Sequence, residues 1–252
     1  MSGLIRGVVN FLPTLSPVRW GAVKWAQYRN PITSSGVTID ISDPVVHHQI
    51  PRLVFRQYER EIHSFIKNHL DPSVPVVEFG GGLGYISSAV NQKQDDGVQQ
   101  IVVEPNPDIL PVLERTRELN EAQFIIEKKA YSTTADAVEF NTSGDFTRSS
   151  VGGDMESIEV ETVALADIID KYCLNECGLI VDMEGAEIEL IEEELQTVID
   201  YCPFVIIEYH TFEGMTAKVQ KARRTFEDAG YDLVDERGGT LKKCVYRRQD
   251  NS

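Results

Sequence analysis

Short, continuously apolar runs alternate with stretches of helical periodicity over most of the chain. The apolar runs cover residues 74–79, 100–103, 124–126, 178–181 and 204–207, and helical periodicity lies between several of them, as at 108–120 and 187–202. Strands without alternating polar positions are typical of a parallel sheet that is covered on both faces. The alternation therefore predicts an α/β fold with a doubly wound, mostly parallel sheet.

The two ends of the chain depart from this alternation. Near the C-terminus, a helix at 218–229 precedes two short strands, 231–235 and 243–247, around Gly238-Gly239, which predicts an antiparallel hairpin at the sheet edge. Near the N-terminus we expect a helix at 4–15, a connector at 31–49 with one short strand, and a single helix at 52–70. We therefore divide the chain into an N-terminal extension with helices, residues 1–70, and a Rossmann-like domain, residues 71–252.

A glycine-rich loop follows the first of the buried strands. It reads Glu78-Phe79-Gly80-Gly81-Gly82-Leu83-Gly84 and leads into an apolar helix that begins near Ile86. Gly80, Gly82 and Gly84 allow the backbone to turn tightly and to approach a ligand without a Cβ in the way. The N–H groups of the following helix suit a carboxylate or a phosphate. Glu78 at the strand end disfavours a pyrophosphate and favours a ligand that carries an ammonium or sulfonium group.

Four buried strands end in an acidic residue: Glu78, Glu104, Asp182 and Glu208. We expect these acids to line the carboxyl edge of the sheet, where open α/β folds bind their ligands. Glu104 follows the strand after the glycine loop, at a spacing that suits an acid binding a ribose diol. Asp182 could instead cap the helix that follows it, but capping alone does not explain all four acids.

These motifs resemble those of the FkbM family of methyltransferases. The glycine loop and Val102-Val103-Glu104-Pro105-Asn106-Pro107 are similar to the family's cofactor motifs, and Val181-Asp182-Met183-Glu184-Gly185-Ala186-Glu187 matches its D-x-E-G-x-E block, the most specific of the set. Ala130-Tyr131-Ser132 corresponds to a short A-x-S-like segment. Residues 163–169 resemble a T-L-D-D signature, with Ala164 and Ala166 as departures. The resemblance covers about residues 74–210 and leaves out the N-terminal 70 residues, a candidate source of substrate selectivity.

The resemblance implies a class I methyltransferase fold with a seven-stranded sheet and S-adenosylmethionine as the methyl donor. It also implies O-methylation of a small molecule, a sugar or a glycan. Together with the spacing of the motifs, it gives these cofactor-binding residues: Glu78, Gly80, Gly82, Gly84, Glu104, Pro105 and Ala130.

A hydroxyl acceptor must lose its proton, so we expect a base near the same sheet edge. The catalytic candidates are His210, whose ordinary pKa lies near neutrality, and the acids Asp182 and Glu208. Candidate substrate contacts are Glu184, Tyr131, Ser149 and Ser150, the last two in a segment, residues 141–154, that we expect to be a mobile loop. Asp182 with Glu208 or His210 could also hold a divalent cation, but we favour a site without a metal.

Two other functions stay open. An NAD(P)-dependent Rossmann dehydrogenase also uses a glycine loop and a ribose acid, but the third glycine of its G-x-G-x-x-G motif is missing. Counting from Gly80 places Tyr85 at that position, and counting from Gly82 places Ser87 there. A non-catalytic, acidic interaction module on the same scaffold is the third reading, and the intact glycines and four acids argue against it.

The net charge of the chain limits the classes of molecule that the protein is expected to bind. The net charge is −16, and such an acidic protein repels phosphate backbones, which excludes nucleic acid as a favoured substrate. An acid excess with few lysines also favours a halophilic protein, in which salt screens the self-repulsion.

The first 39 residues contain only basic charges, Arg6, Arg19, Lys24 and Arg29, interleaved with Trp20 and Trp25. Residues 1–30 could therefore contact a membrane surface or a second subunit. No apolar run is long enough to span a membrane, no signal peptide is recognised, and the four cysteines fit free thiols. We therefore expect a cytoplasmic protein, with association with a membrane surface as the open alternative.

Overall fold

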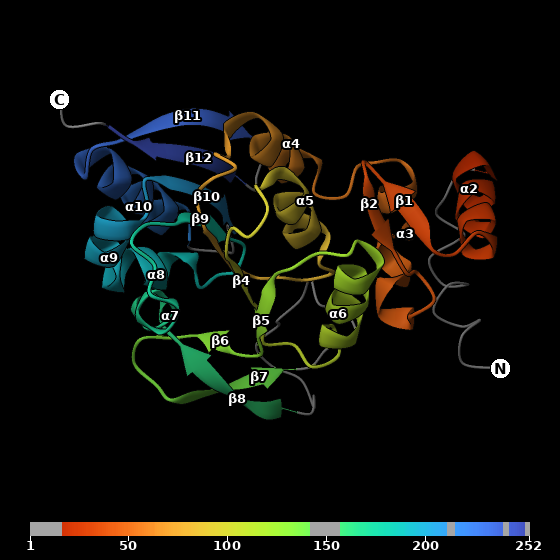
Figure 1. The fold of residues 1–252 in the computed structure, drawn as a ribbon, viewed down its shortest axis with the longest axis horizontal. Coiled ribbons are helices and arrows are strands. Elements are labelled where there is room, and N and C mark those ends of the chain that lie inside the picture. The colour runs from red at the N-terminus through yellow and green to blue at the C-terminus, as the bar shows by residue number, and fades with distance from the viewer. Residues whose placement is uncertain (1–16, 142–156, 211–214, 239–241, 250–252) are drawn as a thin grey trace.

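The central sheet of the computed structural model has seven strands in the order β11-β12-β10-β9-β3-β4-β5 (Figure 1). The structure describes residues 17–141, 157–210, 215–238 and 242–249. The five strands β10, β9, β3, β4 and β5 are parallel, and β12 pairs antiparallel with both β10 and β11. The prediction of a mostly parallel seven-stranded sheet with an antiparallel hairpin at its edge is therefore confirmed.

The strands of this sheet are β3 (Val76–Phe79), β4 (Gln100–Val103), β5 (Ile125–Glu127), β9 (Gly178–Val181), β10 (Phe204–Tyr209), β11 (Tyr231–Arg237) and β12 (Lys242–Arg248). The helices that follow the N-terminal segment are α4 (Arg60–His69), α5 (Tyr85–Lys93), α6 (Leu110–Leu119), α7 (Leu165–Tyr172), α8 (Glu187–Glu193), α9 (Leu195–Tyr201) and α10 (Thr216–Asp228).

Helices cover both faces of the sheet because successive strand residues point to opposite faces. On β3, Val76 belongs to a core shared with α4 and α5, whereas Val77 and Phe79 belong to a core shared with α7 through α10. All four residues of β3, β4 and β9 are buried. The continuous apolar runs of the sequence thus result from burial on both sides.

The N-terminal segment packs onto one face of the domain. It comprises α2 (Pro17–Tyr28), the hairpin β1 (Ile32–Ser34) and β2 (Val37–Ile39), the 3-10 turn η2 (Pro44–Gln49) and α3 (Ile50–Val54). Val23, Ile39 and Leu53 lie in the same core as Val76 of β3. The boundary at residue 70 stays a prediction, but the described part of the extension shares its core with the sheet.

Two helices that we predicted as continuous are each divided. The stretch 52–70 is interrupted between α3 and α4, where Arg56 and Glu59 have left-handed φ angles of 53° and 44°. The stretch 187–202 is interrupted at Glu194, whose carboxylate accepts hydrogen bonds from the backbone N–H groups of Leu165 (2.8 Å) and Ala166 (2.9 Å). Glu194 therefore caps α7, a long-range role that helical periodicity does not reveal.

A second, three-stranded sheet was not predicted. It has the order β6-β8-β7 and consists of β6 (Ala130–Tyr131), β7 (Ala137–Asn141) and β8 (Ser157–Val163) (Figure 1). The expected loop at 141–154, with Ser149 and Ser150, lies outside the described residues except for Asn141. Among the helices that the structure describes, none has the length and apolarity needed to cross a membrane.

Candidate functional site

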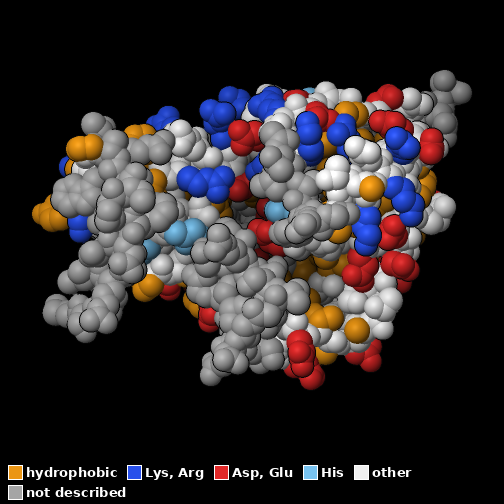
Figure 2. Space-filling model, turned by 180° about the vertical axis from the view of Figure 1, so that it is seen from behind, with side chains coloured by type: hydrophobic (Ala, Val, Ile, Leu, Met, Phe, Trp, Pro, Cys, Tyr) orange, Lys and Arg blue, Asp and Glu red, His pale blue; other side chains and the backbone are white. Residues whose placement is uncertain are grey.

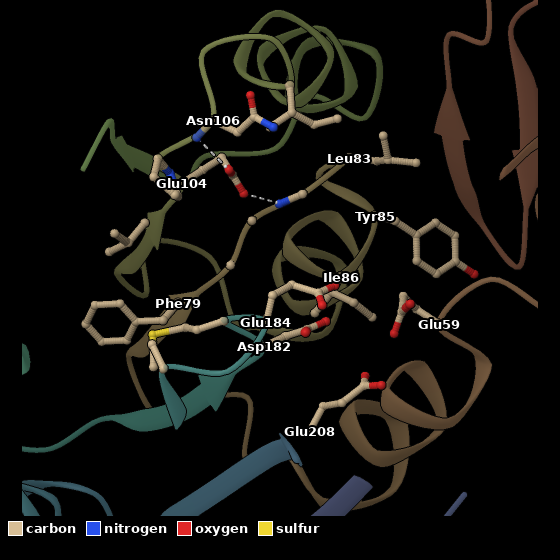
Figure 3. Close-up of a pocket in the computed structure, with 18 of the residues that line it drawn as sticks. Glu59, Phe79, Leu83, Tyr85, Ile86, Glu104, Asn106, Asp182, Glu184 and Glu208 are labelled. Atoms are coloured by element: carbon tan, nitrogen blue, oxygen red, sulfur yellow. Dashed lines mark hydrogen bonds between the residues drawn. The ribbon is translucent and has the colours of Figure 1, made fainter. Parts of the chain in front are cut away.

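A cavity of about 620 Å³ lies at the carboxyl edge of the parallel strands. One end is formed by Gly80–Gly82 and Glu104, and we call it the glycine end. The other end, which we call the acid end, is formed by Glu59, Asp182, Glu184, Glu208, His210 and Lys243. Figure 2 shows a hollow near the centre of one face, with acidic side chains and a histidine at its edge. Figure 3 shows the labelled carboxylates of the acid end facing a common space.

Gly80 lies where the loop of the glycine end contacts the backbone of Asp182 at the acid end. Its φ is +96°, and a Cβ at this position would lie 1.8 Å from the carbonyl oxygen of Asp182. The amide N–H of Asp182 in turn donates to the carbonyl of Phe79 (2.9 Å). Only glycine therefore allows the loop after β3 to contact the loop after β9. This contact places the carboxylate of Asp182 next to the glycine loop.

Glu104 is buried and is held by two backbone donors. Its Oε2 accepts from the N–H of Gly82 (2.7 Å) and its Oε1 from the N–H of Asn106 (2.9 Å) (Figure 3). Burial raises the pKa of Glu104 to about 7, although these two hydrogen bonds oppose the shift. Each carboxylate oxygen has two lone pairs, so both oxygens can still accept from a ligand hydroxyl. Glu104 thus lines the cavity in the manner expected of a ribose-binding acid.

Glu78 and Gly84 do not line the cavity, contrary to our expectation. Glu78 is almost fully buried, and no hydrogen-bond partner for either carboxylate oxygen is found among the described residues. Burial raises its pKa to about 8. On β3 its side chain points to the opposite face from Val77 and Phe79, because side chains alternate along a strand. Gly84 packs against Leu113 of α6, where a Cβ would lie 2.8 Å from Cδ1.

Pro105 and Ala130, which we predict to bind the cofactor, and Tyr131, which we predict to contact the substrate, line the cavity. The ring of Tyr131 contacts Phe79 edge to face, with 5.3 Å between the ring centroids. Residue 130 begins the small sheet, so β6 brings this segment beside the carboxyl end of β3. These side chains give the cavity an apolar wall, which suits the flat face of a nucleobase.

The glycine end fits S-adenosylmethionine, the donor that the resemblance implies. The backbone of Gly82 borders open space, since a Cβ there would meet no protein atom within 4 Å. The α5 helix begins directly after the loop, so its N–H groups can bind the carboxylate of an amino acid. Glu104 would hold the ribose, and the apolar wall would contact the adenine. We infer these roles from the donors, acceptors and space present.

His210 is surrounded by carboxylates at the acid end. Its Nδ1 lies 2.8 Å from Oε1 of Glu187, and its Nε2 lies 3.4 Å from Oε2 of Glu184 and 3.7 Å from Oδ1 of Asp182. Burial alone would lower its pKa, but the hydrogen bond to Glu187 and the nearby acids raise it to about 9. His210 is therefore an imidazolium at neutral pH.

Glu187 orders the loop between β9 and α8. The buried Oε1 of Glu187 accepts from the backbone N–H groups of Met183 and Gly185, both at 3.1 Å, and lies beside His210. Glu184 within this loop has a left-handed φ of 50°. The last acid of the D-x-E-G-x-E block thus fixes both the loop and the imidazole.

Asp182 and Glu184 have pKa values above their ordinary range. For Asp182 the causes are burial and the carboxylates of Glu208 and Glu59, which the charge of His210 opposes. For Glu184 the main cause is again burial. The ionised form of a carboxylate with a raised pKa is a stronger base than an exposed carboxylate, so Asp182 in its ionised form can accept a proton from a hydroxyl group.

Lys243 forms ion pairs with the two other acids of this end, Glu59 and Glu208. Its Nζ lies 2.7 Å from Oε2 of Glu208 and 2.9 Å from Oε2 of Glu59. Burial raises the pKa of Glu208, and Lys243 opposes that shift. The two carboxylates together raise the pKa of Lys243, which therefore remains charged.

Two groups of side chains among the described residues have the composition and spacing to hold a metal ion. One is Asp182, Glu187 and His210, and the other is Glu59, Asp182 and Glu208; within each group the ligand atoms lie within 4.8 Å of one another. In both groups a cationic side chain already contacts the carboxylates: His210 in the first and Lys243 in the second.

Our reading of the sequence missed Glu59, Glu187 and Lys243 as site residues. Lys243 had one usable signal, because a lysine inside a short apolar strand requires a buried partner. Glu187 is the last residue of the D-x-E-G-x-E block, but the motif alone did not indicate a role for it. Glu59 had no signal, since it lies at the break of a helix that we expected to be continuous.

Residues 78–233 match the methyltransferase FkbM domain family. No curated protein matches the chain significantly. Among solved structures, precorrin-6y C5,15-methyltransferase from Geobacter metallireducens is similar with 11% identity and a TM-score of 0.49, over 77% of this chain and 89% of that one. Magnesium protoporphyrin IX methyltransferase from Synechocystis, determined with bound donor, is similar with 10% identity and a TM-score of 0.46, over 90% and 91%. Because the family match spans more than half of the chain and includes the glycine loop, Glu104, Asp182 and His210, the chain belongs to the FkbM family of S-adenosylmethionine-dependent methyltransferases.

Proposed function

We propose that the protein methylates a hydroxyl oxygen of a small molecule, a sugar or a glycan. The observation that carries the proposal is the contact between Gly80 and the backbone of Asp182. It brings a carboxylate with a raised pKa to the border between the glycine end and the acid end. An acceptor hydroxyl at that border is close both to a base and to the donor site.

S-adenosylmethionine, when bound, supplies a methyl group that is already activated by the sulfonium charge. The protein then has to align the acceptor oxygen, exclude water and accept one proton. Asp182 accepts that proton in our proposal. His210 is protonated near neutral pH and so acts as a charge partner for Asp182 and Glu184. The sequence left His210, Asp182 and Glu208 as candidate bases, and among them we propose Asp182.

We also propose that the reaction needs no divalent cation. Lys243 and His210 already supply positive charge to the carboxylates that would otherwise bind one. A metal ion would have to displace these side chains or share their carboxylates. The family match leaves no support for the dehydrogenase reading, and an acidic protein remains a poor partner for nucleic acid.

The test uses donor labelled with ¹³C on its methyl group and a panel of small hydroxylated compounds. We expect a methoxy carbon signal in the product, formed equally well with and without a chelator. A product methylated on nitrogen or carbon would contradict O-methylation. Activity that is lost with the chelator and restored by a divalent cation would contradict the metal-free mechanism only.

A further inference from the structure

Lys243 connects three distant segments of the chain at the acid end. It lies directly opposite Glu208 in the antiparallel pair of β12 and β10, which explains their ion pair. Glu59 precedes α4 and reaches the same ammonium from the N-terminal segment. Lys243 and Glu208 are both more than nine-tenths buried. We call this arrangement the Glu59–Lys243–Glu208 bridge.

Two members of the bridge lie outside the region that matches the FkbM family. That region runs from residue 78 to residue 233, whereas Glu59 and Lys243 lie before and after it. Gln49, Arg52 and Tyr58 of the N-terminal segment also line the cavity. The part of the cavity that surrounds the acceptor therefore combines residues of the matched region with residues that precede and follow it.

The bridge retains hydrogen-bonding capacity on the cavity side. An ammonium carries three N–H donors, and among the described residues Glu59 and Glu208 account for two of them. The carboxylates keep further lone pairs that can accept. A hydroxyl group can accept from the ammonium and donate to a carboxylate at the same time. An anionic ligand would be repelled by the two glutamates and by Asp182 beside them.

Asp182 is close to the bridge. Its carboxylate oxygen and those of Glu59 and Glu208 lie within 4.8 Å of one another. With hydrogen bonds of about 2.7–2.8 Å to each hydroxyl, one molecule with neighbouring hydroxyls can contact Asp182 and the bridge together. We propose that the Glu59–Lys243–Glu208 bridge binds a second hydroxyl beside the one that is methylated, so that the acceptor is a polyol without an anionic group. The inference rests on the proposed O-methylation and names the features that select its substrate.

The experiment compares two probes, myo-inositol and cyclohexanol, which share a six-membered carbon ring and differ in their number of hydroxyls. Binding of each is measured by NMR titration of the full chain saturated with S-adenosylhomocysteine. A site built to hydrogen-bond a hydroxyl discriminates strongly against an analogue that lacks it. We expect myo-inositol to bind at least about tenfold more tightly than cyclohexanol.

The variants are Glu59→Gln and Lys243→Met, with Glu61→Gln and Lys242→Met as matched controls. Glu61 pairs with Arg60, and Lys242 with Glu236; neither lines the cavity. We expect both bridge variants to lose the preference for myo-inositol and both controls to keep it. Affinity for S-adenosylhomocysteine, unchanged within about threefold, identifies the variants that fold; Glu59→Gln decides the test if Lys243→Met does not.

Equal binding of the two probes, binding of neither, or an unchanged preference in Glu59→Gln would overturn the inference. The proposed function fails differently. If labelled methyl appears on nitrogen or carbon, O-methylation is wrong whatever the probes show. If both alcohols give methoxy products equally well in the wild type and in Glu59→Gln, O-methylation holds and the bridge does not select the acceptor.

Discussion

The two ends of the cavity are built from different chemical groups, mainly backbone at the glycine end and charged side chains at the acid end. At the glycine end, three consecutive glycines supply backbone, and one carboxylate, Glu104, is held by two backbone N–H groups. At the acid end, six charged side chains come from four separate segments, and each is oriented by another charge. A site for a common cofactor can be made of backbone and a short motif. A site that recognises one acceptor needs side chains, which the tertiary fold must bring together.

The difference also concerns where charge is neutralised. Backbone dipoles stabilise the charge of Glu104, so no cation is needed at the glycine end. Lys243 and His210 neutralise the acid end, where burial and like charges raise the pKa of Asp182. We therefore expect substitutions at the acid end to change turnover, and substitutions at the glycine end to change donor affinity.

Asp182→Asn should have the largest effect on turnover. Loss of a general base lowers kcat by roughly 10²–10⁴, while affinity for S-adenosylhomocysteine should stay within about threefold. Glu193→Gln, a change at an exposed acid on α8, is the control. If Asp182→Asn keeps more than half of the wild-type kcat, the base lies elsewhere and the division between the two ends loses its main support.

Gly80→Ala should damage both ends together. The added Cβ would meet the carbonyl of Asp182, a backbone atom that no side-chain rotation can move. We expect the free energy of unfolding to fall by about 3 kcal/mol or more. Gly97→Ala is matched, because Gly97 also has a left-handed φ, 82°, but no atom within 4 Å of the added Cβ. It should cost only about 1–2 kcal/mol. Equal losses in the two variants, measured by chemical denaturation, would contradict the close approach of the two loops.

Glu78→Gln should have a smaller effect, visible in the pH dependence of stability. The pKa of Glu78 is raised from 4.5 to about 8, so its contribution is greatest below pH 4.5 and is lost as the pH rises towards 8. His210, raised from 6.5 to about 9, contributes fully below 6.5 and loses its contribution as the pH rises through 9. Glutamine mimics the neutral form of Glu78. In Glu78→Gln, the fall in stability that Glu78 causes between pH 4.5 and 8 should disappear, whereas the fall that His210 causes should remain. Parallel curves for variant and wild type between pH 5 and 8 would show that Glu78 is ionised in the fold.

Local pattern was enough to predict the sheet, the edge hairpin and the glycine end. Gly80, Gly82 and Glu104 are set by a strand, a loop and a second strand that follow one another in the sequence. Glu78 was misplaced because the strand-end rule locates a backbone position and not the direction of a side chain. On β3 that direction is fixed by which core Val77 and Phe79 enter.

The acid end could be predicted only where its residues end a strand, as Asp182, Glu208 and His210 do, or lie in the D-x-E-G-x-E block, as Glu184 does. Lys243 reaches Glu208 through the register of β10 and β12, which depends on the whole edge hairpin. Glu59 reaches Lys243 because the chain breaks between α3 and α4 at residues with left-handed φ. Neither the strand register nor the helix break can be recognised from the hydrophobic periodicity of the sequence.

The measurement that tests the central claim most directly is a calorimetric titration of the wild type and Glu104→Ala with S-adenosylhomocysteine and with NAD. We expect the wild type to bind S-adenosylhomocysteine and not NAD. Glu104→Ala removes charge-assisted hydrogen bonds worth about 1.5–3 kcal/mol, which corresponds to an affinity loss of roughly 10- to 100-fold. Binding of NAD, or an affinity for S-adenosylhomocysteine that Glu104→Ala leaves unchanged within a factor of about two, would contradict the account.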